Sequence, residues 1–576
     1  MAPLGVNGQT SFFVDTLGQV LGFNALEQKG LIRLFRLTPN YLEWAWPRWG
    51  EPRVGKDGTP RPPRIKGFDA VKAIQCLEKA AGQKGPFDPA DKVRGRGAWN
   101  DDAGHLLWHS GDAIWRVKRG KLEHAPPGEQ GRWFYPRRPT VMAPWQEPVS
   151  IEDSPARDMF HMLNTWSFER GPVDAVIAIG GIGTMLIGGA LRQRPHIAAM
   201  GDFGVGKTEL NAFIKAVVGD ALLDCANATE AGIRQRMDFD TLPVAIDEFE
   251  ASEHGDNRRV GAIIDLMRAS YSGGRVLRGG ADHQGVEFQA RSAFFASGIN
   301  LPPMTPADRS RFSILNLGAL DASKTGKRPI VQEGDGRMLL RQLMDAWPQF
   351  PGVLADWENA IKCAGLSGRV QNTYGTLFAV AQLLLGPELI EEAGLPVTDL
   401  QRLGETIASI TITERAAQVE NWRACLEHLL QVPIDSWRSG EKPSVGRVIE
   451  DLERGDLELK YARERLAAAG LGIRDLSGVD YEAIWQLLPE PRPERPARSH
   501  PAPWYLLAVP VQKSAALAPL FAGTKWSHGG WVAALQQGPK HIIRRDAGVK
   551  RLVKINRVAT QCVLVDLAAY DATAEG

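Results

Sequence analysis

The sequence predicts an α/β protein with an α+β domain before its core, and helices and a small basic domain after it. Three apolar runs predict strands of the core, because each has the length of a buried strand and is followed by polar residues. These runs are residues 196–200, 242–246 and 291–299. The third strand is expected to lie beside the second.

The first run leads into residues 201–208, which match the pattern G-x-x-x-x-G-K-[ST], and a helical apolar pattern follows over 209–218. A strand before the pattern and a helix after it favour a phosphate-binding loop over an ordinary glycine-rich turn. Its glycines let backbone N–H groups approach phosphates, Lys207 is expected to pair with the β- and γ-phosphates, and Thr208 to bind Mg²⁺. The residues expected to bind ATP or GTP are Gly201, Gly204, Val205, Gly206, Lys207 and Thr208.

The second run delivers two adjacent carboxylates, Asp247 and Glu248. Downstream of a phosphate-binding loop, the first is expected to hold Mg²⁺ through water and the second to polarise the water that attacks the γ-phosphate. An enzyme that transfers phosphate to a small molecule does not need a water-activating base, so the pair favours ATP hydrolysis. The alternative is a solvated turn at a strand end.

Polar residues follow the third run as well. Asn300 stands at its end, where an amide is placed to orient the attacking water and to register the γ-phosphate. Two arginines, Arg309 and Arg311, directly precede a further apolar run, 312–315. A guanidinium is always charged and stabilises the transferred phosphoryl group, usually from a neighbouring subunit. The alternative for both arginines is a surface salt bridge.

Together these motifs resemble those of the AAA+ ATPases, and most of all the superfamily 3 and poxvirus-type helicases, including the ATPase part of primase-helicase proteins of prophages and integrated elements. The resemblance covers residues 150–390, and segment 228–235 is similar to a signature of that group. It implies that Asn300 is a sensor 1 residue. Residues 310–312 are similar to the arginine-finger segment of minichromosome-maintenance helicases, so Arg311 is preferred to Arg309. No primase motif is found in the sequence.

Two further segments are candidates for function. Residues 275–288 contain two strand-like runs around a polar glycine-rich turn, which predicts a β-hairpin. The resemblance implies that the hairpin points into the pore of a hexamer and contacts DNA through Arg278 and His283; an ordinary surface hairpin is the alternative. Arg369 precedes an apolar helical run and is a candidate sensor 2 residue, on a helical lid that closes over the nucleotide; a solvating role at a helix start is the alternative.

Changes in composition predict five segments. They are an N-terminal α+β domain at 1–150, the ATPase core at 151–330, a helical lid and extension at 331–487, a Pro-rich linker at 488–503 and a winged-helix-like domain at 504–576. Near the N-terminus, Trp44, Trp46 and Trp49 precede a Pro/Gly-rich loop with basic residues. This combination suits single-stranded DNA, and a core tryptophan cluster beside a solvated loop is the alternative.

The C-terminal segment is basic. Residues 525–557 contain eight Lys/Arg, Lys550 and Arg551 among them, and one acid, Asp546. A helix followed by a basic two-stranded wing is expected to bind duplex DNA or to dock on the helicase ring. A solvated basic face on a packing domain is the alternative.

Composition limits the remaining possibilities. The 576 residues are 44% hydrophobic and carry a formal net charge of +1, so nucleic-acid binding has to come from local patches. The five cysteines form no C-x-x-C pair, which predicts neither a zinc site nor disulfides and indicates a reducing cytoplasm. The resemblance to proteins of phages and integrated elements implies that this is the bacterial cytoplasm. A signal-peptide pattern is not visible, and the apolar run 175–191 is expected to be a helix inside the ATPase domain, so no membrane association is predicted.

These observations predict an ATP-dependent, ring-forming, hexameric DNA helicase that replicates a phage, plasmid or integrated mobile element. Its expected partners are single-stranded and duplex DNA, further copies of the chain, and a primase or other replication proteins. Two other functions fit the same residues. One is a non-helicase AAA+ machine for remodelling, defence or transposition, and the other is a DNA-binding initiator switched by ATP.

Overall fold

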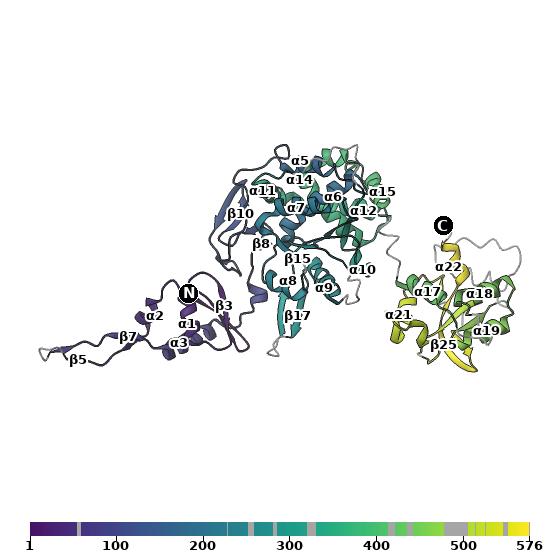
Figure 1. The fold of residues 1–576 in the computed structure, drawn as a ribbon, viewed down its shortest axis with the longest axis horizontal. Coiled ribbons are helices and arrows are strands. Elements are labelled where there is room, and N and C mark those ends of the chain that lie inside the picture. Colours follow the sequence, from purple (N-terminus) through teal and green to yellow (C-terminus); the bar gives the residue numbers. More distant parts are fainter. Residues whose placement is uncertain are drawn as a thin grey trace. The chain divides into compact units, whose positions relative to one another are not determined.

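In the computed structural model, the described residues are 1–54, 59–226, 228–250, 258–279, 285–319, 330–412, 421–434, 442–476, 505–512, 514–524, 526–544 and 551–574. They belong to two compact units, Met1–Glu414 and Arg415–Gly576 (Figure 1). Each unit has a hydrophobic core of its own.

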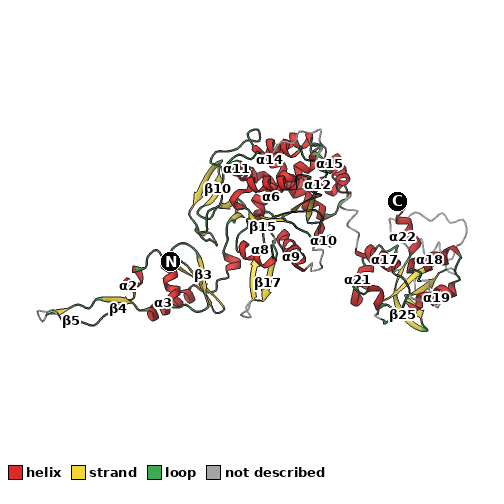
Figure 2. Cartoon of the chain, viewed as in Figure 1, coloured by secondary structure: helices red, strands yellow, loops and turns green. Residues whose placement is uncertain are grey.

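A five-stranded parallel sheet forms the centre of the first unit (Figure 2). Its strands are β14 (His196–Gly201), β15 (Leu223–Ala226), β16 (Val244–Asp247), β19 (Phe294–Gly298) and β20 (Phe312–Leu317). They lie in the order β15-β16-β19-β14-β20, and every neighbouring pair is parallel. The predicted α/β class is confirmed, and the carboxyl ends of β14, β16 and β19 share one edge.

Helix α6 (Pro172–Ile187) fills the core of this unit and packs against α14 (Thr376–Glu392). Glycines permit the close packing, because a Cβ on Gly180 would lie 2.1 Å from the carbonyl oxygen of Leu377. Among the described residues, two helical segments are long and apolar enough to cross a membrane, Pro172–Ala190 around α6 and Gly368–Glu392 around α14. Both are largely buried inside the unit. The expected burial of residues 175–191 is therefore confirmed.

The first 92 residues form α+β structure with a small core around Phe13 and Leu31. It contains the antiparallel strands β1 (Ala2–Asn7), β2 (Thr10–Val14) and β3 (Val20–Phe23), and the helices α1 (Gln28–Leu34), α2 (Asn40–Ala45), α3 (Ala70–Lys84) and α4 (Pro89–Lys92). Between α2 and α3 the chain forms an antiparallel ribbon. In it β4 (Pro47–Trp49) pairs with β7 (Ile65–Phe68), and β5 (Arg53–Val54) with β6 (Pro60–Arg61).

The next part of the chain packs on the core of the central sheet. It contains the antiparallel sheet of β8 (Gly97–Asn100), β9 (Leu106–His109), β10 (Ile114–Lys118) and β11 (Lys121–Ala125), and the pair β12 (Gly128–Gln130) and β13 (Trp133–Tyr135). Ala98 and Trp108 belong to the same core cluster as α6, and Arg96 forms a partly buried ion pair with Asp240. The structure therefore differs from the boundary predicted at residue 150, because side chains before it complete the core of the residues after it.

Helices follow the last strand of the sheet, as predicted. They include α11 (Asp335–Ala346), α12 (Phe350–Cys363), α13 (Gly368–Val370), α14 and α15 (Leu400–Ile410). Their buried side chains, such as Leu343, Trp357 and Leu403, belong to the core cluster of the sheet. The helices predicted to form a lid are thus part of the first unit, and this unit ends near residue 414 rather than at 487.

The second unit begins before the predicted linker. It contains α17 (Asn421–Gln431), α18 (Val445–Arg454), α19 (Leu459–Ala468), β21 (Gly472–Asp475), β22 (Tyr505–Pro510), α21 (Gly530–Leu535), β23 (Ile543–Arg544), β24 (Leu552–Ile555), β25 (Val558–Val565) and α22 (Leu567–Ala574). β21 pairs with β22, β22 with β25, and β25 with both β23 and β24.

This pairing corrects the predicted C-terminal boundaries. The linker at 488–503 lies outside the described residues, but the strand before it, β21, is hydrogen-bonded to the strand after it, β22. One core contains Leu426 and Leu466 from before the linker together with Trp531 and Val565 from after it. The predicted extension to 487 and the predicted domain at 504–576 are therefore parts of one unit.

Candidate nucleotide-binding site

The phosphate-binding loop connects β14 to α7 (Lys207–Val218). Two of its glycines, Gly204 and Gly206, have positive φ angles of 77° and 89°, which favour glycine. Space is limited as well: a Cβ on Gly206 would lie 2.8 Å from Nε1 of Trp166, and one on Gly201 would lie 2.6 Å from the carbonyl oxygen of Leu317. Trp166 holds the turn by donating its indole N–H to the carbonyl oxygen of Gly206 over 3.2 Å.

The side chains that follow the glycines are accessible at the start of α7. The Lys207 ammonium donates hydrogen bonds to the carbonyl oxygens of its own loop, those of Gly201 and, at 3.2 Å, Asp202. Thr208 is exposed in the first turn of the helix, and Val205 is buried beneath the loop. The amino end of α7 has free N–H groups in its first turn, so anion binding is expected here.

Asp247 is fixed by three hydrogen bonds at the end of β16. Its Oδ1 accepts them from the Ser297 hydroxyl at 2.7 Å, from Nδ2 of Asn211 at 3.1 Å and from the backbone N–H of Glu248 at 3.1 Å. Asn211 Nδ2 also donates to Ser297 Oγ over 2.8 Å. Both side chains are nearly buried, Ser297 on β19 and Asn211 on α7, so one polar network joins three elements at the edge of the sheet.

Sequence reasoning missed Asn211 and Ser297. One signal was present in each case: Asn211 interrupts the apolar face of α7, and Ser297 interrupts the apolar run of β19. A polar residue inside a buried strand or on the buried face of a helix needs a hydrogen-bond partner. For Ser297 on β19, the neighbouring strand β16 ends in a carboxylate that can accept this hydrogen bond, that of Asp247.

Glu248 follows Asp247 in an unusual backbone conformation. Its φ is 56°, a left-handed value that costs energy for a residue with a Cβ. The next residue explains why the turn persists, because the ring of Phe249 is buried and its N–H donates to the carbonyl oxygen of Ser297 over 2.8 Å. As a result, the Glu248 side chain is exposed at the edge of the sheet while its neighbours are anchored.

Asn300 lies two residues after the end of β19 and is exposed. Since β19 lies between β14 and β16, this amide follows the strand next to both the phosphate-binding loop and the carboxylate pair. The structure therefore brings together, at one edge, the predicted loop, Asp247, Glu248 and Asn300.

The arginines before β20 lie at the opposite edge. Arg311 accepts a hydrogen bond at its carbonyl oxygen from the N–H of His196, the first residue of β14, whereas the loop follows Gly201, the last residue. The six residues of β14 span about 20 Å at roughly 3.3 Å per residue. Neither Arg309 nor Arg311 can reach the phosphate-binding loop of its own chain.

The two arginines differ in their surroundings. Arg311 donates to the carbonyl oxygen of Ala307, lies 3.8 Å from Asp308 and packs over the ring of Tyr271 at 5.7 Å. Burial, and then the nearby charge of Arg369, lowers the pKa of Arg311. Among the described residues, Arg309 has no ion-pair partner.

Arg369 is not placed over the nucleotide site of its own chain. It also packs on Tyr271, with its guanidinium carbon 5.4 Å from the ring centroid, on the same residue as Arg311. Tyr271 lies near the start of β14, because its carbonyl oxygen accepts a hydrogen bond from the N–H of Arg194, so Arg369 lies toward the edge opposite the phosphate-binding loop. Its role as a sensor 2 residue stays a prediction.

The predicted hairpin is present. β17 (Arg275–Gly279) and β18 (Gly285–Gln289) are antiparallel, with Arg278 opposite Val286. In Figure 1 the hairpin extends away from the sheet, and Arg275 near its base forms an ion pair with Asp91. His283 lies outside the described residues, as does Lys550 in the second unit, while Arg551 is exposed directly before β24.

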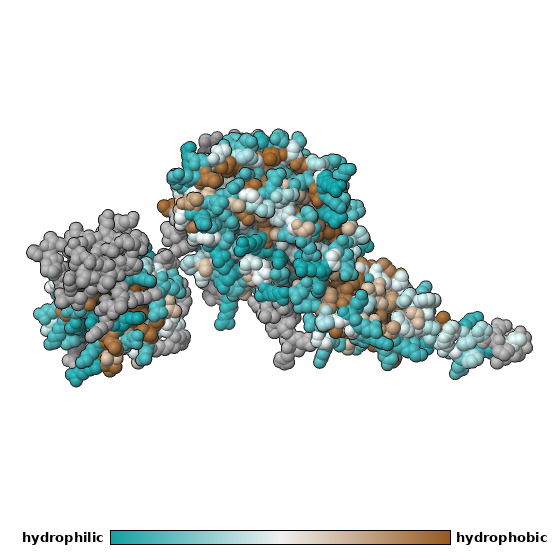
Figure 3. Space-filling view, turned by 180° about the vertical axis from the view of Figure 1, so that it is seen from behind, coloured by the Kyte–Doolittle hydropathy of each residue, from teal (hydrophilic) through white to brown (hydrophobic). Residues whose placement is uncertain are grey.

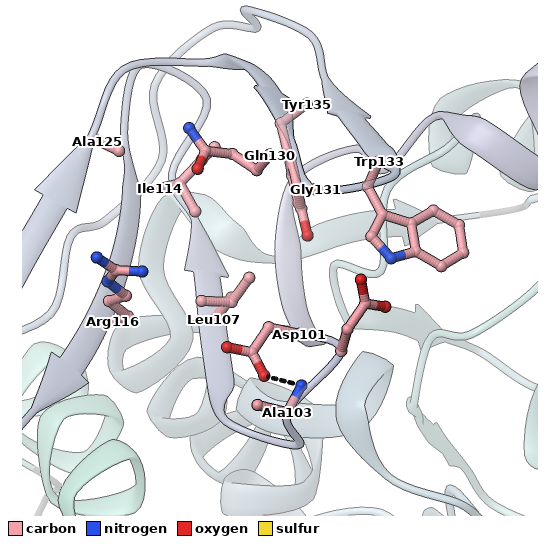
Figure 4. A pocket seen from close by; sticks show the side chains of 11 residues that line it. Asp101, Ala103, Leu107, Ile114, Arg116, Ala125, Gln130, Gly131, Trp133 and Tyr135 are labelled. Carbon is pink, nitrogen blue, oxygen red and sulfur yellow. Dashed lines mark hydrogen bonds between the residues drawn. The ribbon is translucent and has the colours of Figure 1, made fainter.

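A cavity of about 290 Å³ lies elsewhere in the first unit, between β9, β10 and the β12–β13 pair (Figure 4). It is lined by Asp101, Asp102, Ala103, Leu107, Ile114, Arg116, Ala125, Gln130, Gly131, Trp133 and Tyr135. Arg94 packs on one of the lining residues, since its guanidinium carbon lies 3.6 Å from the ring centroid of Trp133. None of the predicted nucleotide-site residues lines this cavity, so it is separate from the P-loop site.

Comparison with known proteins adds little to this geometry. No family model matches the chain, and no curated protein matches it. Among solved structures, the chain is similar to the C-terminal region, 305–718, of NrS-1, with 10% identity and a TM-score of 0.30 over 81% of this chain and 95% of that one. It is also similar to a protein from Cytophaga hutchinsonii described as an ATPase, with 13% identity and a TM-score of 0.28 over 44% of this chain and 92% of that one. Because these TM-scores are low, we draw no conclusion about the site from either similarity, and the site is described from its own contacts. The chain is an α/β protein with a P-loop.

Proposed function

We propose that the protein hydrolyses ATP and acts as a ring-forming DNA helicase in the replication of a phage, plasmid or integrated mobile element. The observation that carries the hydrolytic part is the carboxylate pair after β16. Asp247 is fixed by Asn211 and Ser297, while Glu248 is exposed at the same edge as the phosphate-binding loop. One carboxylate is thus held in place for a metal and the next is free to reach a water molecule.

ATP binding follows from the loop and from α7. The phosphates would lie on the backbone N–H groups of the loop, and Lys207 would exchange the carbonyl oxygens of Gly201 and Asp202 for phosphate oxygens. Such an exchange needs only rotation of a flexible side chain.

The residues also fit Mg²⁺. Thr208 and Asp247 would hold it, and both offer the hard oxygen donors that it prefers. In the described part of the chain, no three His, Cys, Asp or Glu side chains gather as a metal site, which suits an ion bound mainly through water and phosphate oxygens. Mg²⁺ supplies charge neutralisation on the phosphates when it is bound.

Glu248 and Asn300 would act on the attacking water. The Glu248 carboxylate accepts a hydrogen bond from the water and takes its proton as the water attacks, and the Asn300 amide orients it. The fixed turn at Phe249 keeps Glu248 from folding back into the sheet. Both residues therefore contribute by position as well as by chemistry.

The arginines support assembly into a ring. Arg309, Arg311 and Arg369 all lie toward the edge of the sheet that is opposite the phosphate-binding loop. A guanidinium from this edge can stabilise a γ-phosphate only on a neighbouring copy of the chain. We propose a hexamer, in which Arg311 completes the site of the next subunit and the β17–β18 hairpin, with Arg278 and His283, contacts DNA.

ATP hydrolysis and strand separation test the proposal together. We would measure both on a forked duplex, with and without single-stranded DNA, for the wild type, Glu248→Gln and the control Asp356→Asn, an exposed acid on α12. We expect DNA to stimulate hydrolysis, the fork to open, and Glu248→Gln to lower the rate by about a hundredfold or more.

Two results would change the proposal. Equal phosphate release by Glu248→Gln and the wild type would remove the hydrolytic assignment and favour the ATP-switched initiator. Strong hydrolysis without strand separation, in a preparation that forms rings on DNA, would favour the remodelling class of AAA+ machine.

A further inference from the structure

The segment between α1 and α3 concentrates positive charge. Residues 28–68 contain nine Lys/Arg and three Asp/Glu, in a chain whose formal net charge is +1. Arg48, Arg53, Arg64 and Lys66 on the antiparallel ribbon are exposed. None of these four has an ion-pair partner among the residues that the structure describes. Uncompensated cations along one segment favour binding to a polyanion.

The same segment exposes large rings. Trp44 on α2 is 74% exposed and Trp49 on β4 is 58% exposed, and Tyr41 is exposed beside them. Surface tryptophans of this extent are uncommon, because burying such a ring is favourable. Rings that stay exposed beside positive charge are suited to stacking on a ligand.

Trp46 has a different role from its two neighbours. It packs against the small N-terminal core and lies edge-on to Phe35, with ring centroids 6.3 Å apart. Tyr41 stacks on Phe35 at 5.3 Å with an interplanar angle of 10°, and Trp44 lies 5.3 Å from Tyr41. The two predicted alternatives, a core tryptophan and a tryptophan for stacking on DNA, thus apply to different residues. Trp46 packs against the core, whereas Trp44 is exposed and contacts Tyr41, which in turn stacks on the core residue Phe35.

Rings and charges lie close together along the ribbon. Trp49 is paired with Ile65 across β4 and β7, so the two point to the same face. Lys66 follows Ile65 in β7 and points to the other face, where a Cβ on Gly50 would meet its Cε at 2.9 Å. The register shifts between Pro47 and Trp49, so alternation does not place Arg48; a Cβ on Gly67 of β7 would lie 3.7 Å from its Nη2. Cationic side chains therefore lie on both strands beside the exposed ring of Trp49.

The ribbon extends away from α1 and α3 (Figure 1), and in Figure 3 it is the narrow, mainly hydrophilic extension of the first unit. A two-stranded ribbon in water is only marginally stable, since it buries little apolar surface. A ribbon that exposes an aromatic ring beside cationic side chains is suited to a ligand that offers both flat rings and phosphates.

We propose that α2 and the β4–β7 ribbon form a binding site for single-stranded DNA. Bases stack on Trp44 and Trp49, and phosphates pair with Arg48, Arg64 and Lys66. Single strands fit better than duplex, because only unpaired bases present their faces to a tryptophan. The inference goes beyond the proposed ATPase and helicase activity and does not depend on either, since the site contains none of the nucleotide-binding residues.

Fluorescence anisotropy of a labelled 20-nucleotide oligo(dT) tests the proposal, with the full-length protein in EDTA and without nucleotide. We expect Trp44→Ala/Trp49→Ala to weaken binding by tenfold or more, because stacking contributes about 1–3 kcal/mol per base. Arg48→Ala/Lys66→Ala is expected to lower the slope of log K against log salt by about 1.4, at roughly 0.7 per phosphate contact.

Controls come from the next helix. Val71→Ala and Lys79→Ala remove an exposed apolar and an exposed cationic side chain from α3, and both are expected to bind as the wild type does. The thermal midpoint should stay unchanged in all variants, since each altered side chain is exposed.

Two outcomes would overturn the proposal. One is wild-type affinity and salt dependence in both double variants. The other is tighter binding to a duplex of equal length that the same substitutions abolish, which would assign the ribbon to duplex DNA. Failure of the helicase assay would leave this binding measurement unaffected, so the two proposals fail separately.

Discussion

The hydroxyl of Ser297 donates a hydrogen bond of 2.7 Å to Asp247, although the two residues lie on different strands and are 50 positions apart in the chain. The same hydroxyl accepts a hydrogen bond from Asn211 of α7. The strand that leads to Asn300 and the helix that follows the phosphate-binding loop therefore both hold the carboxylate that we propose binds Mg²⁺. A change in either one is transmitted to Asp247 by direct contact.

Ser297→Ala is expected to lower the rate of ATP hydrolysis by about 10- to 100-fold, because hydrogen bonds to charged groups contribute roughly 1.5–3 kcal/mol. Nucleotide binding should be kept, and activity should depend on a higher Mg²⁺ concentration. Steady-state kinetics over a Mg²⁺ titration would measure both. Ser313→Ala is the matched control, since Ser313 is equally buried on β20 and does not touch Asp247. Equal loss in both variants would indicate only a general effect on the sheet.

Arg311→Ala is expected to abolish turnover while nucleotide binding persists, since we propose that the guanidinium acts on the site of the next subunit. Mixing it with Glu248→Gln should restore activity at hybrid interfaces, because each interface needs one intact Arg311 and one intact Glu248. Arg309→Ala, mixed with Glu248→Gln in the same way, tests Arg309 as the alternative arginine finger. Absence of rescue in rings shown to contain both variants would argue against a finger supplied in trans.

Gly206→Ala is expected to weaken ATP binding by more than tenfold and to lower the free energy of unfolding by about 1–2 kcal/mol. The φ of 89° is left-handed, which disfavours any residue with a Cβ, and the added methyl group would press on Trp166. Gly352→Ala on α12 is the control, since a Cβ there meets nothing within 4 Å and its helical position favours alanine. Equilibrium ATP titration and urea unfolding would measure the two effects.

Stability should fall as the pH drops from about 6.5 to 4. His109 is buried, and burial, assisted by the charges of Arg96 and Arg138, lowers its pKa to about 4. Unfolding lets the imidazole take up a proton in this range, so the unfolded state gains stability there, on the order of 3 kcal/mol for this one group. In His109→Asn, whose amide can still donate to the carbonyl oxygen of Gly95, the free energy of unfolding should change less between pH 7 and pH 4.5. An equal change in both proteins would assign the acid sensitivity to other groups.

Residues 415–576 are expected to fold alone, whereas residues 504–576 are not. The shorter fragment lacks β21 and the helices α17, α18 and α19, so the apolar faces of β22 and α21 would be exposed. Near-ultraviolet circular dichroism and amide dispersion in NMR spectra would distinguish a packed fragment from an unfolded one. A well-dispersed spectrum for 504–576 would contradict the single core described for this unit.

The sequence predicts the nucleotide site better than the domain boundaries, for a physical reason. The loop, the carboxylate pair and Asn300 each follow a short apolar run, and a parallel sheet brings such positions to one edge whatever its exact strand order. Asn211 and Ser297 were missed because their role depends on which strands are neighbours in the sheet. The local pattern of apolar and polar residues does not reveal the order of the strands.

Boundaries depend on packing between distant segments. Proline-rich composition at 488–503 indicates an extended segment, but it does not show that β21 and β22 are hydrogen-bonded partners. Likewise, Trp108 carries no sequence signal that it packs with α6. Arg369 also shows this limit, because its place on Tyr271 follows from how the helices after β20 pack on the rest of the first unit.

The pairing of β21 with β22 has a consequence for handling the protein. A protease that cuts between these strands breaks the backbone but leaves the sheet, and the cut pieces should co-elute from a sizing column until a denaturant separates them. A denaturing gel would therefore show two fragments although the second unit is still folded in solution. The effect of cleavage on activity would have to be measured on the native sample.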